Sequence, residues 1–418
     1  MKSKKGYWLI SVIVLIILLG KSVFYNIYNC FLQYEHQFWK IQKEIPSKTV
    51  SLYDKEGTEK ELEQPGSLYA RSAALYDAEG GRILYSKNGN TKMAMASTTK
   101  IMTCIVILEN ATEKEIVTIS SNAAKQPDVQ LNVNTGEKYY LGDLLYSLML
   151  ESHNDVAVAL AEHVGGSVEG FATLMNEKAK ELGCNQTNFV TPNGLDATKH
   201  YTTAEELCKI AAYALENERF CSIIQTPSHT FSDVDKKRSF YVSNKNRFLQ
   251  MYQGALGVKT GFTNNAGYCF VGAVKRKEDT FVSAVLASGW PPNKNYKWSD
   301  TIALIDYGVK NFERKRFFEK EIALPAIKVY GGKEKQVCIE SKLLKNVEFL
   351  SAGTENEKIV LEINEFINAP IKQGEVIGNI YYYIDDEIYD TIPISVKSDV
   401  EKVDLSYTLE KVFSIWSQ

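Results

Sequence analysis

Three short motifs contain the side chains that acyl transfer through a serine ester requires. In chain order they are Ser97-Thr98-Thr99-Lys100, Ser152-His153-Asn154 and Lys259-Thr260-Gly261. The first supplies a hydroxyl nucleophile with an amine one helical turn away, the second a further hydroxyl and an amide, and the third a cation. The first and third patterns occur once each in the 418 residues, whereas Ser-x-Asn also occurs elsewhere. The presence of all three motifs in this order predicts nucleophilic catalysis by a serine.

The first motif opens a segment, 97–109, whose apolar run without Gly or Pro predicts a buried helix. Residues three apart share a helix face, so the Lys100 amine is expected beside the Ser97 hydroxyl. The free N–H groups of the helix N-terminus favour negative charge on a substrate oxygen. Lys100 accepts a proton only when it is neutral, which requires burial or a second cation, for which Lys259 is the candidate. Taken alone, the motif also fits a capping serine followed by an exposed lysine.

The third motif lies in a predicted β-hairpin. The strands are expected at 257–262 and 268–274, with Asn264 and Asn265 in the turn. A strand edge hydrogen-bonds an extended peptide, and the lysine and threonine of the motif suit a terminal carboxylate. An ordinary turn is the alternative interpretation of an isolated Lys-Thr-Gly.

The second motif lies between two apolar runs, 141–150 and 156–160. Two helices joined by a polar corner would present Ser152 and Asn154 to a cleft. The alternative is that Ser152 only caps a helix.

The ordered motifs resemble those of the serine penicillin-binding proteins, and their surroundings resemble the low-molecular-mass D-alanyl-D-alanine carboxypeptidases. The resemblance covers about 68–317 and, more loosely, the tail to Val396. Stretches outside the motifs agree as well, at 72–77, 191–196 and 200–204. The resemblance implies a mixed α/β fold: a β-lactamase/DD-peptidase-like catalytic domain with an antiparallel sheet covered by helices, followed by a small all-β sandwich domain.

The same resemblance implies a reaction. The last D-alanine of a peptidoglycan stem peptide would be removed through an acyl-enzyme on Ser97, with Lys100 as proton acceptor. Ser152 and Asn154 would relay protons and hold the substrate backbone. The implied partners are stem peptides ending in D-Ala-D-Ala and β-lactam antibiotics.

The resemblance also assigns the binding groups on the hairpin. Lys259 and Thr260 would grip the terminal carboxylate of the substrate. The backbone N–H groups of Ser97 and Phe262 would form the oxyanion hole.

One residue departs from the family pattern, because the middle motif commonly has Gly where this chain has His153. An imidazole there narrows the cleft, adds a group that titrates near pH 7, or is a tolerated substitution, which we favour. Two other functions compete: a serine β-lactamase, for which no deacylating Glu motif is identified near 177–195, and an inactive cell-wall binder, for which His153 is the only support.

Composition excludes several other classes of function. The net charge is 48 minus 51, or −3, which gives no reason to expect a nucleic-acid partner. None of the seven cysteines forms Cys-x-x-Cys and no His-Glu-x-x-His is present, so no metal site and no cofactor are expected. The odd count and apolar settings such as those of Cys104 and Cys269 predict free thiols.

The N-terminus predicts export. Lys2, Lys4 and Lys5 precede the uncharged stretch 7–20, an arrangement typical of a secretory signal with its basic end inside. We therefore expect the protein at the outer face of the cytoplasmic membrane, with 1–34 as either a cleaved signal or an uncleaved anchor.

Composition and hydrophobic pattern divide the remaining chain. A linker is expected over 35–67, the catalytic domain over 68–320 and the β-sandwich over 326–397. A strand within the sandwich is expected at 347–350. An amphipathic helix over 401–418 either contacts a membrane surface or packs on the β domain.

Two helices of the catalytic domain are expected from local patterns. A capping box at Thr203 and Glu206 opens one of them. The other ends the domain, and its core face is predicted from side chains spaced three and four apart, Trp298, Ile302, Ile305, Val309 and Phe312.

Overall fold

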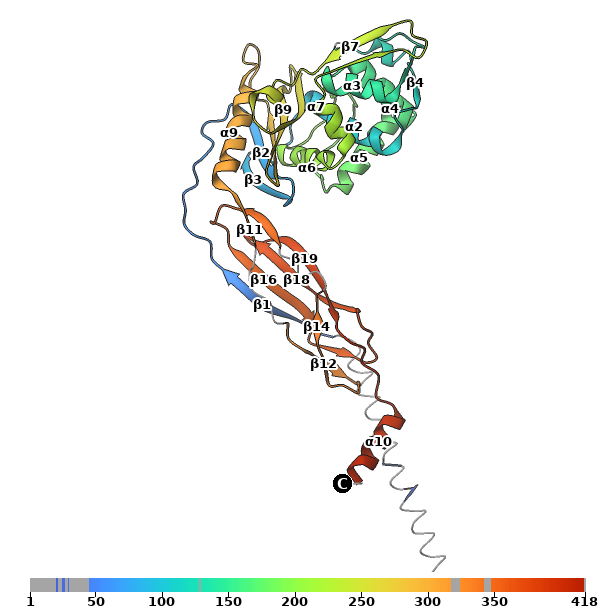
Figure 1. The fold of residues 1–418 in the computed structure, drawn as a ribbon, viewed down its shortest axis with the longest axis vertical. Helices are drawn as coiled ribbons and strands as arrows, with labels where there is room; N and C mark the ends of the chain where they lie inside the picture. Colours follow the sequence, from blue (N-terminus) through green and yellow to red (C-terminus); the bar gives the residue numbers. More distant parts are fainter. Residues whose placement is uncertain are drawn as a thin grey trace, which may run out of the picture. The chain divides into compact units, whose positions relative to one another are not determined.

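The protein was analysed as a computed structural model that describes residues 45–127, 129–316, 324–341 and 347–416, with five further positions between 20 and 29. The chain forms two compact units (Figure 1). The α/β unit comprises 59–316 and 348–353, and the β unit comprises the described residues of 1–58, 317–347 and 354–418. The predicted signal or anchor, apart from those five positions, lies outside the described residues. Within the described parts of the chain, no helix is long and apolar enough to cross a bilayer.

A five-stranded antiparallel sheet forms the centre of the α/β unit, in the order β3-β2-β10-β9-β8. Its strands are β2 (Ser72–Asp77), β3 (Arg82–Lys87), β8 (Ala255–Thr263), β9 (Gly267–Arg276) and β10 (Asp279–Leu286). Within β2, Ala74 joins the apolar core on one face of the sheet and Leu75 joins the core on the other. Because both faces are covered, the strand is buried at every position and shows no polar alternation.

Helices cover the two faces of this sheet, which confirms the fold class. On one face, α9 (Tyr296–Asn311) packs against β9 and β10; on the other, α6 (Ala204–Leu215) packs against β2 and β10 (Figure 1). The remaining helices are α2 (Lys100–Asn110), α3 (Leu141–Leu150), α4 (Asn154–Gly165), α5 (Val168–Glu181), α7 (Glu218–Gln225) and α8 (Phe248–Met251), with 3-10 turns η1 (Ala96–Thr99) and η2 (Ala123–Lys125). Two small hairpins complete the unit, formed by β4 (Ile116–Thr118), β5 (Lys138–Tyr140), β6 (Ser228–Ser232) and β7 (Ser239–Ser243).

The two helices predicted from local patterns are present with small differences. Thr203 caps α6 by accepting a hydrogen bond from the Glu206 N–H, as expected. The Glu206 carboxylate, however, accepts from the backbone of Gln186 instead of reaching back to the cap. In α9, the prediction that Val309 faces the core is wrong, since it is 39 % exposed. The preceding residue, Gly308, lies against the sheet instead.

The β unit contains the expected small all-β region. Its five-stranded antiparallel sheet has the order β1-β16-β18-β19-β14, and a three-stranded sheet has the order β13-β12-β17. The strands are β1 (Ser47–Lys55), β12 (Ile327–Tyr330), β13 (Gln336–Val337), β14 (Ile339–Glu340), β16 (Glu357–Asn364), β17 (Phe366–Asn368), β18 (Val376–Ile384) and β19 (Glu387–Val396). Helix α10 (Leu405–Trp416) follows them.

Two segments differ from the expected division of the chain. Within the linker expected over 35–67, residues 47–55 form β1, which pairs with β16. This strand was missed because an edge strand has one neighbour and is half exposed, so its polar sequence alternates weakly. The strand expected at 347–350 in the sandwich is β15 (Glu348–Ser351), which pairs with β11 (Glu313–Arg316) in the α/β unit. Local alternation predicts a strand but does not identify its partner.

Candidate active site

The first motif lies where η1 runs directly into α2. Ser97 is within the 3-10 turn and Lys100 is the first residue of the helix. The two side chains meet, since Lys100 Nζ lies 3.0 Å from Ser97 Oγ. Ala96, which precedes the serine, has a φ of +49°, in the left-handed region that L residues rarely adopt. The turn therefore holds Ser97 in a particular orientation at the helix N-terminus.

Lys100 is fully buried and has three polar neighbours. Besides Ser97, its Nζ lies 2.9 Å from Asn154 Oδ1 and 2.6 Å from the carbonyl oxygen of Asn193. Burial, and secondarily the nearby Lys259 cation, hold the pKa of the Lys100 amine well below its usual value. A neutral amine fits these partners, because its two N–H groups are donated to the two carbonyl-type oxygens. Its lone pair then faces the Ser97 hydroxyl.

The second motif occupies the corner between α3 and α4. Ser152 has a φ of +71°, and its buried Oγ has no hydrogen-bond partner among the residues that the structure describes. Asn154 opens α4, and its backbone N–H donates to the carbonyl of Val129 over 2.7 Å. The corner thus provides one unpaired hydroxyl and one amide whose oxygen contacts Lys100.

The third motif lies on β8, an edge strand that pairs with β9 in the expected hairpin. A Cβ atom on Gly261 would lie 3.0 Å from the backbone nitrogen of Ser97, so the strand passes directly beside the serine. Lys259 is buried and donates to the carbonyl of Thr260 over 3.1 Å. Burial lowers the pKa of Lys259 to about 7. The three motifs are therefore gathered around one serine.

A cleft of about 410 Å³ opens at this point. Of the predicted site residues, Ser97, Ser152, Thr260 and Phe262 line it. The other three are buried and do not line it: Lys100, Asn154 and Lys259. The remaining lining residues are Val129, Glu151, Lys245, Arg247, Gly261, Tyr268, Lys294, Asn295, Lys297 and Trp298.

Sequence reasoning missed the basic side of this cleft. Lys297 is buried, with its Nζ 4.6 Å from the ring centroid of Tyr268, and burial lowers its pKa to about 8. Arg247 and Lys294 line the same cleft, and no ion pair joins any of these three to another described residue. These basic residues belong to no common sequence motif, so the sequence did not indicate that they cluster in the fold.

Asn193 was missed as well, although it lies in the stretch 191–196 that supported the resemblance. It acts through its backbone carbonyl, so the side-chain type gave no signal. Gly194 holds this carbonyl in place: it has a φ of +83°, and a Cβ there would lie 2.0 Å from the Ala96 carbonyl oxygen. A side chain at this position would push the loop away from the turn that carries the serine.

His153 lies outside the cleft. Its imidazole is buried, with Nδ1 2.7 Å from Ser147 Oγ and Nε2 3.4 Å from Glu151 Oε2. Burial lowers its pKa. It therefore neither narrows the cleft nor points to solvent, and the inactive alternative loses its only support.

His200, in contrast, lies beneath the serine turn, and it carries a prediction for stability. Burial lowers its pKa from 6.5 to about 4. Between these values the unfolded chain binds a proton that the folded chain does not, so stability falls as the pH falls from about 6.5 to about 4. Urea unfolding of the wild type and of His200→Gln at pH 7 and pH 4.5 measures this effect. Between the two pH values, the free energy of unfolding should fall by about 2 kcal/mol more in the wild type than in the variant. Equal losses would contradict this assignment.

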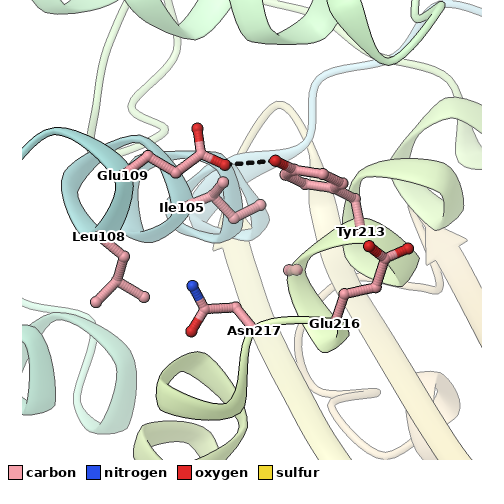
Figure 2. A pocket seen from close by; sticks show the side chains of 7 residues that line it. Ile105, Leu108, Glu109, Tyr213, Glu216 and Asn217 are labelled. Atoms are coloured by element: carbon pink, nitrogen blue, oxygen red, sulfur yellow. Dashed lines mark hydrogen bonds between the residues drawn. The ribbon is translucent and has the colours of Figure 1, made fainter.

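A second hollow of about 210 Å³ lies between α2 and α6 and is a poorer candidate. Figure 2 shows its lining, where the Tyr213 hydroxyl donates to Glu109 over 2.6 Å. The Glu109 carboxylate also pairs with Lys178 at 3.0 Å, so its charge is already compensated. None of the predicted site residues lies there.

Comparisons with known proteins agree with this geometry. The D-alanyl-D-alanine carboxypeptidase family model matches residues 58–289, and that of the penicillin-binding protein 5 C-terminal domain matches 312–402. D-alanyl-D-alanine carboxypeptidase DacF of Bacillus subtilis is 30 % identical over 358 residues, 84 % of this chain and 90 % of DacF. The D-alanyl-D-alanine carboxypeptidase of Streptomyces sp. K15 is 36 % identical over 245 residues, 54 % of this chain and 83 % of that one. The crystal structure of penicillin-binding protein 5 from Haemophilus influenzae superposes with a TM-score of 0.65 at 26 % identity, covering 81 % of this chain and 100 % of that one.

Proposed function

Because this chain belongs to the D-alanyl-D-alanine carboxypeptidase family, we propose that it removes the terminal D-alanine from peptidoglycan stem peptides through an ester on Ser97. The observation that carries the proposal is the contact of 3.0 Å between Ser97 Oγ and the buried Lys100 amine. Burial lowers the pKa of this amine and so favours its neutral form, which is the proposed acceptor of the serine proton as Oγ attacks the carbonyl of the penultimate D-alanine.

The negative charge that develops on the carbonyl oxygen requires donors. The backbone N–H of Ser97, at the N-terminus of α2, and that of Phe262, on the edge strand β8, are the proposed oxyanion hole. The approach of Gly261 to the Ser97 backbone supports this assignment, since it brings both donors to one place.

Departure of the terminal D-alanine requires a proton on its amine. We assign this step to Ser152, whose Oγ lines the cleft with Ser97 and lacks a partner among the described residues. Ser152 donates its proton to the leaving amine and receives in its place the proton that Lys100 took from Ser97, which returns the Lys100 amine to its neutral form. Water then attacks the ester and the neutral Lys100 amine accepts its proton. That proton passes to Ser97 Oγ as the ester bond breaks, which regenerates the serine. Asn154 holds Lys100 through its Oδ1 in both half-reactions.

The terminal carboxylate has cationic partners on the cleft wall. Thr260 lines the cleft and is the proposed hydroxyl donor to this carboxylate, and the buried Lys259 next to it adds positive charge. Arg247 and Lys297 also line the cleft and supply positive charge toward an anionic group. A substrate that ends in a free carboxylate thus suits this site.

The β-lactamase alternative requires a base that deacylates the drug ester. Glu151 is the carboxylate that lines the cleft, but Lys245 lies 2.9 Å from it and the Ser243 N–H donates to it over 3.0 Å. These donors hold its pKa below the usual value against the opposing effect of burial, which makes it a poor base. The carboxypeptidase is therefore favoured.

The family's reaction on peptidoglycan implies export, and we propose that the enzyme acts outside the cytoplasmic membrane. The proposed contact with a membrane surface rests on α10, on which Leu405 and Phe413 are exposed. We keep that contact as a prediction.

Comparing a peptide acid with its amide tests the proposed function. With a pentapeptide ending in D-Ala-D-Ala, the purified chain should release one D-alanine per peptide. The peptide with a C-terminal amide should have a kcat/KM about 10- to 100-fold lower, because it lacks the negative charge that interacts with the cationic side chains of the cleft. Equal cleavage of both, or no release from the acid, would overturn the proposal.

A further inference from the structure

His200 is a buried residue that the reaction does not use, and its hydrogen bonds define its protonation state. Its Nδ1 accepts from the backbone N–H of Val190 over 3.0 Å and faces that of Thr191 at 3.4 Å. A nitrogen that accepts carries no proton, so in the neutral ring the proton is on Nε2. That nitrogen lies 2.9 Å from Thr99 Oγ1 and donates to it.

On the Nε2 side, the imidazole supports the turn that carries the nucleophile. The Thr99 hydroxyl, which accepts from His200, donates in turn to the carbonyl of Ala96 over 2.8 Å. Ala96 is the residue with a φ of +49°, immediately before Ser97. A conformation of this kind costs of order 1–3 kcal/mol and persists only where its surroundings hold it.

On the Nδ1 side, the imidazole supports the loop that holds the base. Val190 and Thr191 lead into Pro192 and Asn193, and the Asn193 carbonyl receives the Lys100 amine at 2.6 Å. The same carbonyl lies 3.4 Å from Ser97 Oγ. One ring thus connects the two backbone segments that set the separation of Ser97 and Lys100.

We propose that His200 is a positioning residue, which fixes the nucleophile and its base relative to each other through Thr99 on one side and the 190–193 loop on the other. It does not line the cleft. Its loss should therefore slow acylation of Ser97 while leaving substrate affinity almost unchanged.

Four variants test the proposal in the full chain, with rates expressed per active site as titrated by penicillin. Thr99→Val keeps the volume but loses the hydroxyl, and His200→Leu loses both ring hydrogen bonds. Each should lower the acylation rate constant about 10- to 100-fold, while the dissociation constant of the noncovalent complex, measured from the dependence of the acylation rate on ligand concentration, stays within about threefold. Thr99→Ser and His200→Gln keep a donor or acceptor for the hydrogen bond between residues 99 and 200. Both variants should retain the acylation rate constant within about threefold.

The double variant, Thr99→Val with His200→Leu, should acylate no more slowly than the slower single variant, because both substitutions break the same hydrogen bond between Thr99 and His200. A residue that only supports folding would lower the titrated fraction and the melting temperature while leaving the rate per site unchanged, and that result would overturn the proposal. If His200→Leu does not fold, Thr99→Val decides the question alone.

The proposal rests on the proposed function, because acylation of Ser97 is the measured step. Acylation of the wild-type chain by penicillin distinguishes failure of the proposed function from failure of this proposal. A wild-type chain that penicillin does not acylate would refute the function, whereas an acylated wild type with equally fast variants would refute only the role of His200.

Discussion

Replacing Ser97 by alanine is expected to reduce D-alanine release by at least about 10⁴-fold. Among the three motifs, Ser97 supplies the hydroxyl that contacts the buried Lys100 amine, at 3.0 Å. Without that oxygen no ester forms, and direct attack by water lacks the positioned nucleophile. Steady-state release of D-alanine from a pentapeptide acid measures the loss.

Two further serine variants make this result specific. Ser152 lines the same cleft, and no described residue hydrogen-bonds its Oγ, so it is the alternative nucleophile. Ser152→Ala should lower the rate but leave penicillin acylation detectable, because its hydroxyl only moves a proton. Ser299→Ala, on the exposed side of α9, serves as the control and should leave the rate unchanged. Activity that survives in Ser97→Ala and disappears in Ser152→Ala would exchange the two roles.

Replacing Lys100 by methionine should lower the acylation rate constant about 10³-fold, within the usual range for the loss of a general base. Methionine fills a similar volume without an amine, so the change removes the acceptor and preserves packing. Lys100→Arg keeps a cation that does not release its proton, and it should be equally slow. Stopped-flow acylation by a chromogenic β-lactam measures both variants.

Lys100→Met is also expected to change how the stability of the fold depends on pH. In the unfolded chain Lys100 binds a proton, whereas in the folded chain burial lowers its pKa and disfavours that proton. Folding therefore costs free energy at pH 7, a cost that disappears as the pH rises toward the unfolded pKa of about 10.4. Lys100→Met removes this cost but leaves Asn154 Oδ1 and the Asn193 carbonyl without their donor. The free energy of unfolding of the variant, measured by urea unfolding relative to the wild type, should therefore increase as the pH falls from about 10 to 7. An active Lys100→Arg variant would show instead that a cation, not a neutral amine, acts in the reaction.

Much of the site was predictable because its chemistry lies in side chains at regular spacings. The separation of Ser97 and Lys100 by three residues places them on one helical turn, and the structure has them in contact. The hairpin of β8 and β9 followed from its turn residues, and the corner at Ser152 followed from the two apolar runs beside it.

Other parts of the site depend on tertiary contacts that have no sequence signature. The Asn193 carbonyl contacts Lys100 through the backbone, which any residue type carries. Arg247 and Lys297 lie 50 residues apart and meet only in the folded cleft. His153 was weighed as a cleft residue because it lies within the second motif, but its imidazole is buried against Ser147.

In the fold, too, features set by local sequence were predictable and features set by tertiary contacts were not. The apolar run of α2 and the cap of α6 predicted their helices, because propensity and spacing act locally. Strand β1 was missed because its edge position leaves only weak apolar alternation, whereas β15 was expected as a strand but placed in the wrong domain, because its pairing with β11 depends on residues distant in the chain. Local alternation thus predicts a strand that has one well-buried face, but it does not identify the strand's partner.

The position of a penicillin adduct tests the central claim most directly. After brief treatment of the purified chain with penicillin, the intact mass should increase by one drug molecule, and peptide mapping should place the modification on Ser97. The adduct should persist, since Glu151 is held by its donors and does not act as a deacylating base. An adduct on Ser152, or a drug that is hydrolysed rapidly without a lasting adduct, would contradict the account.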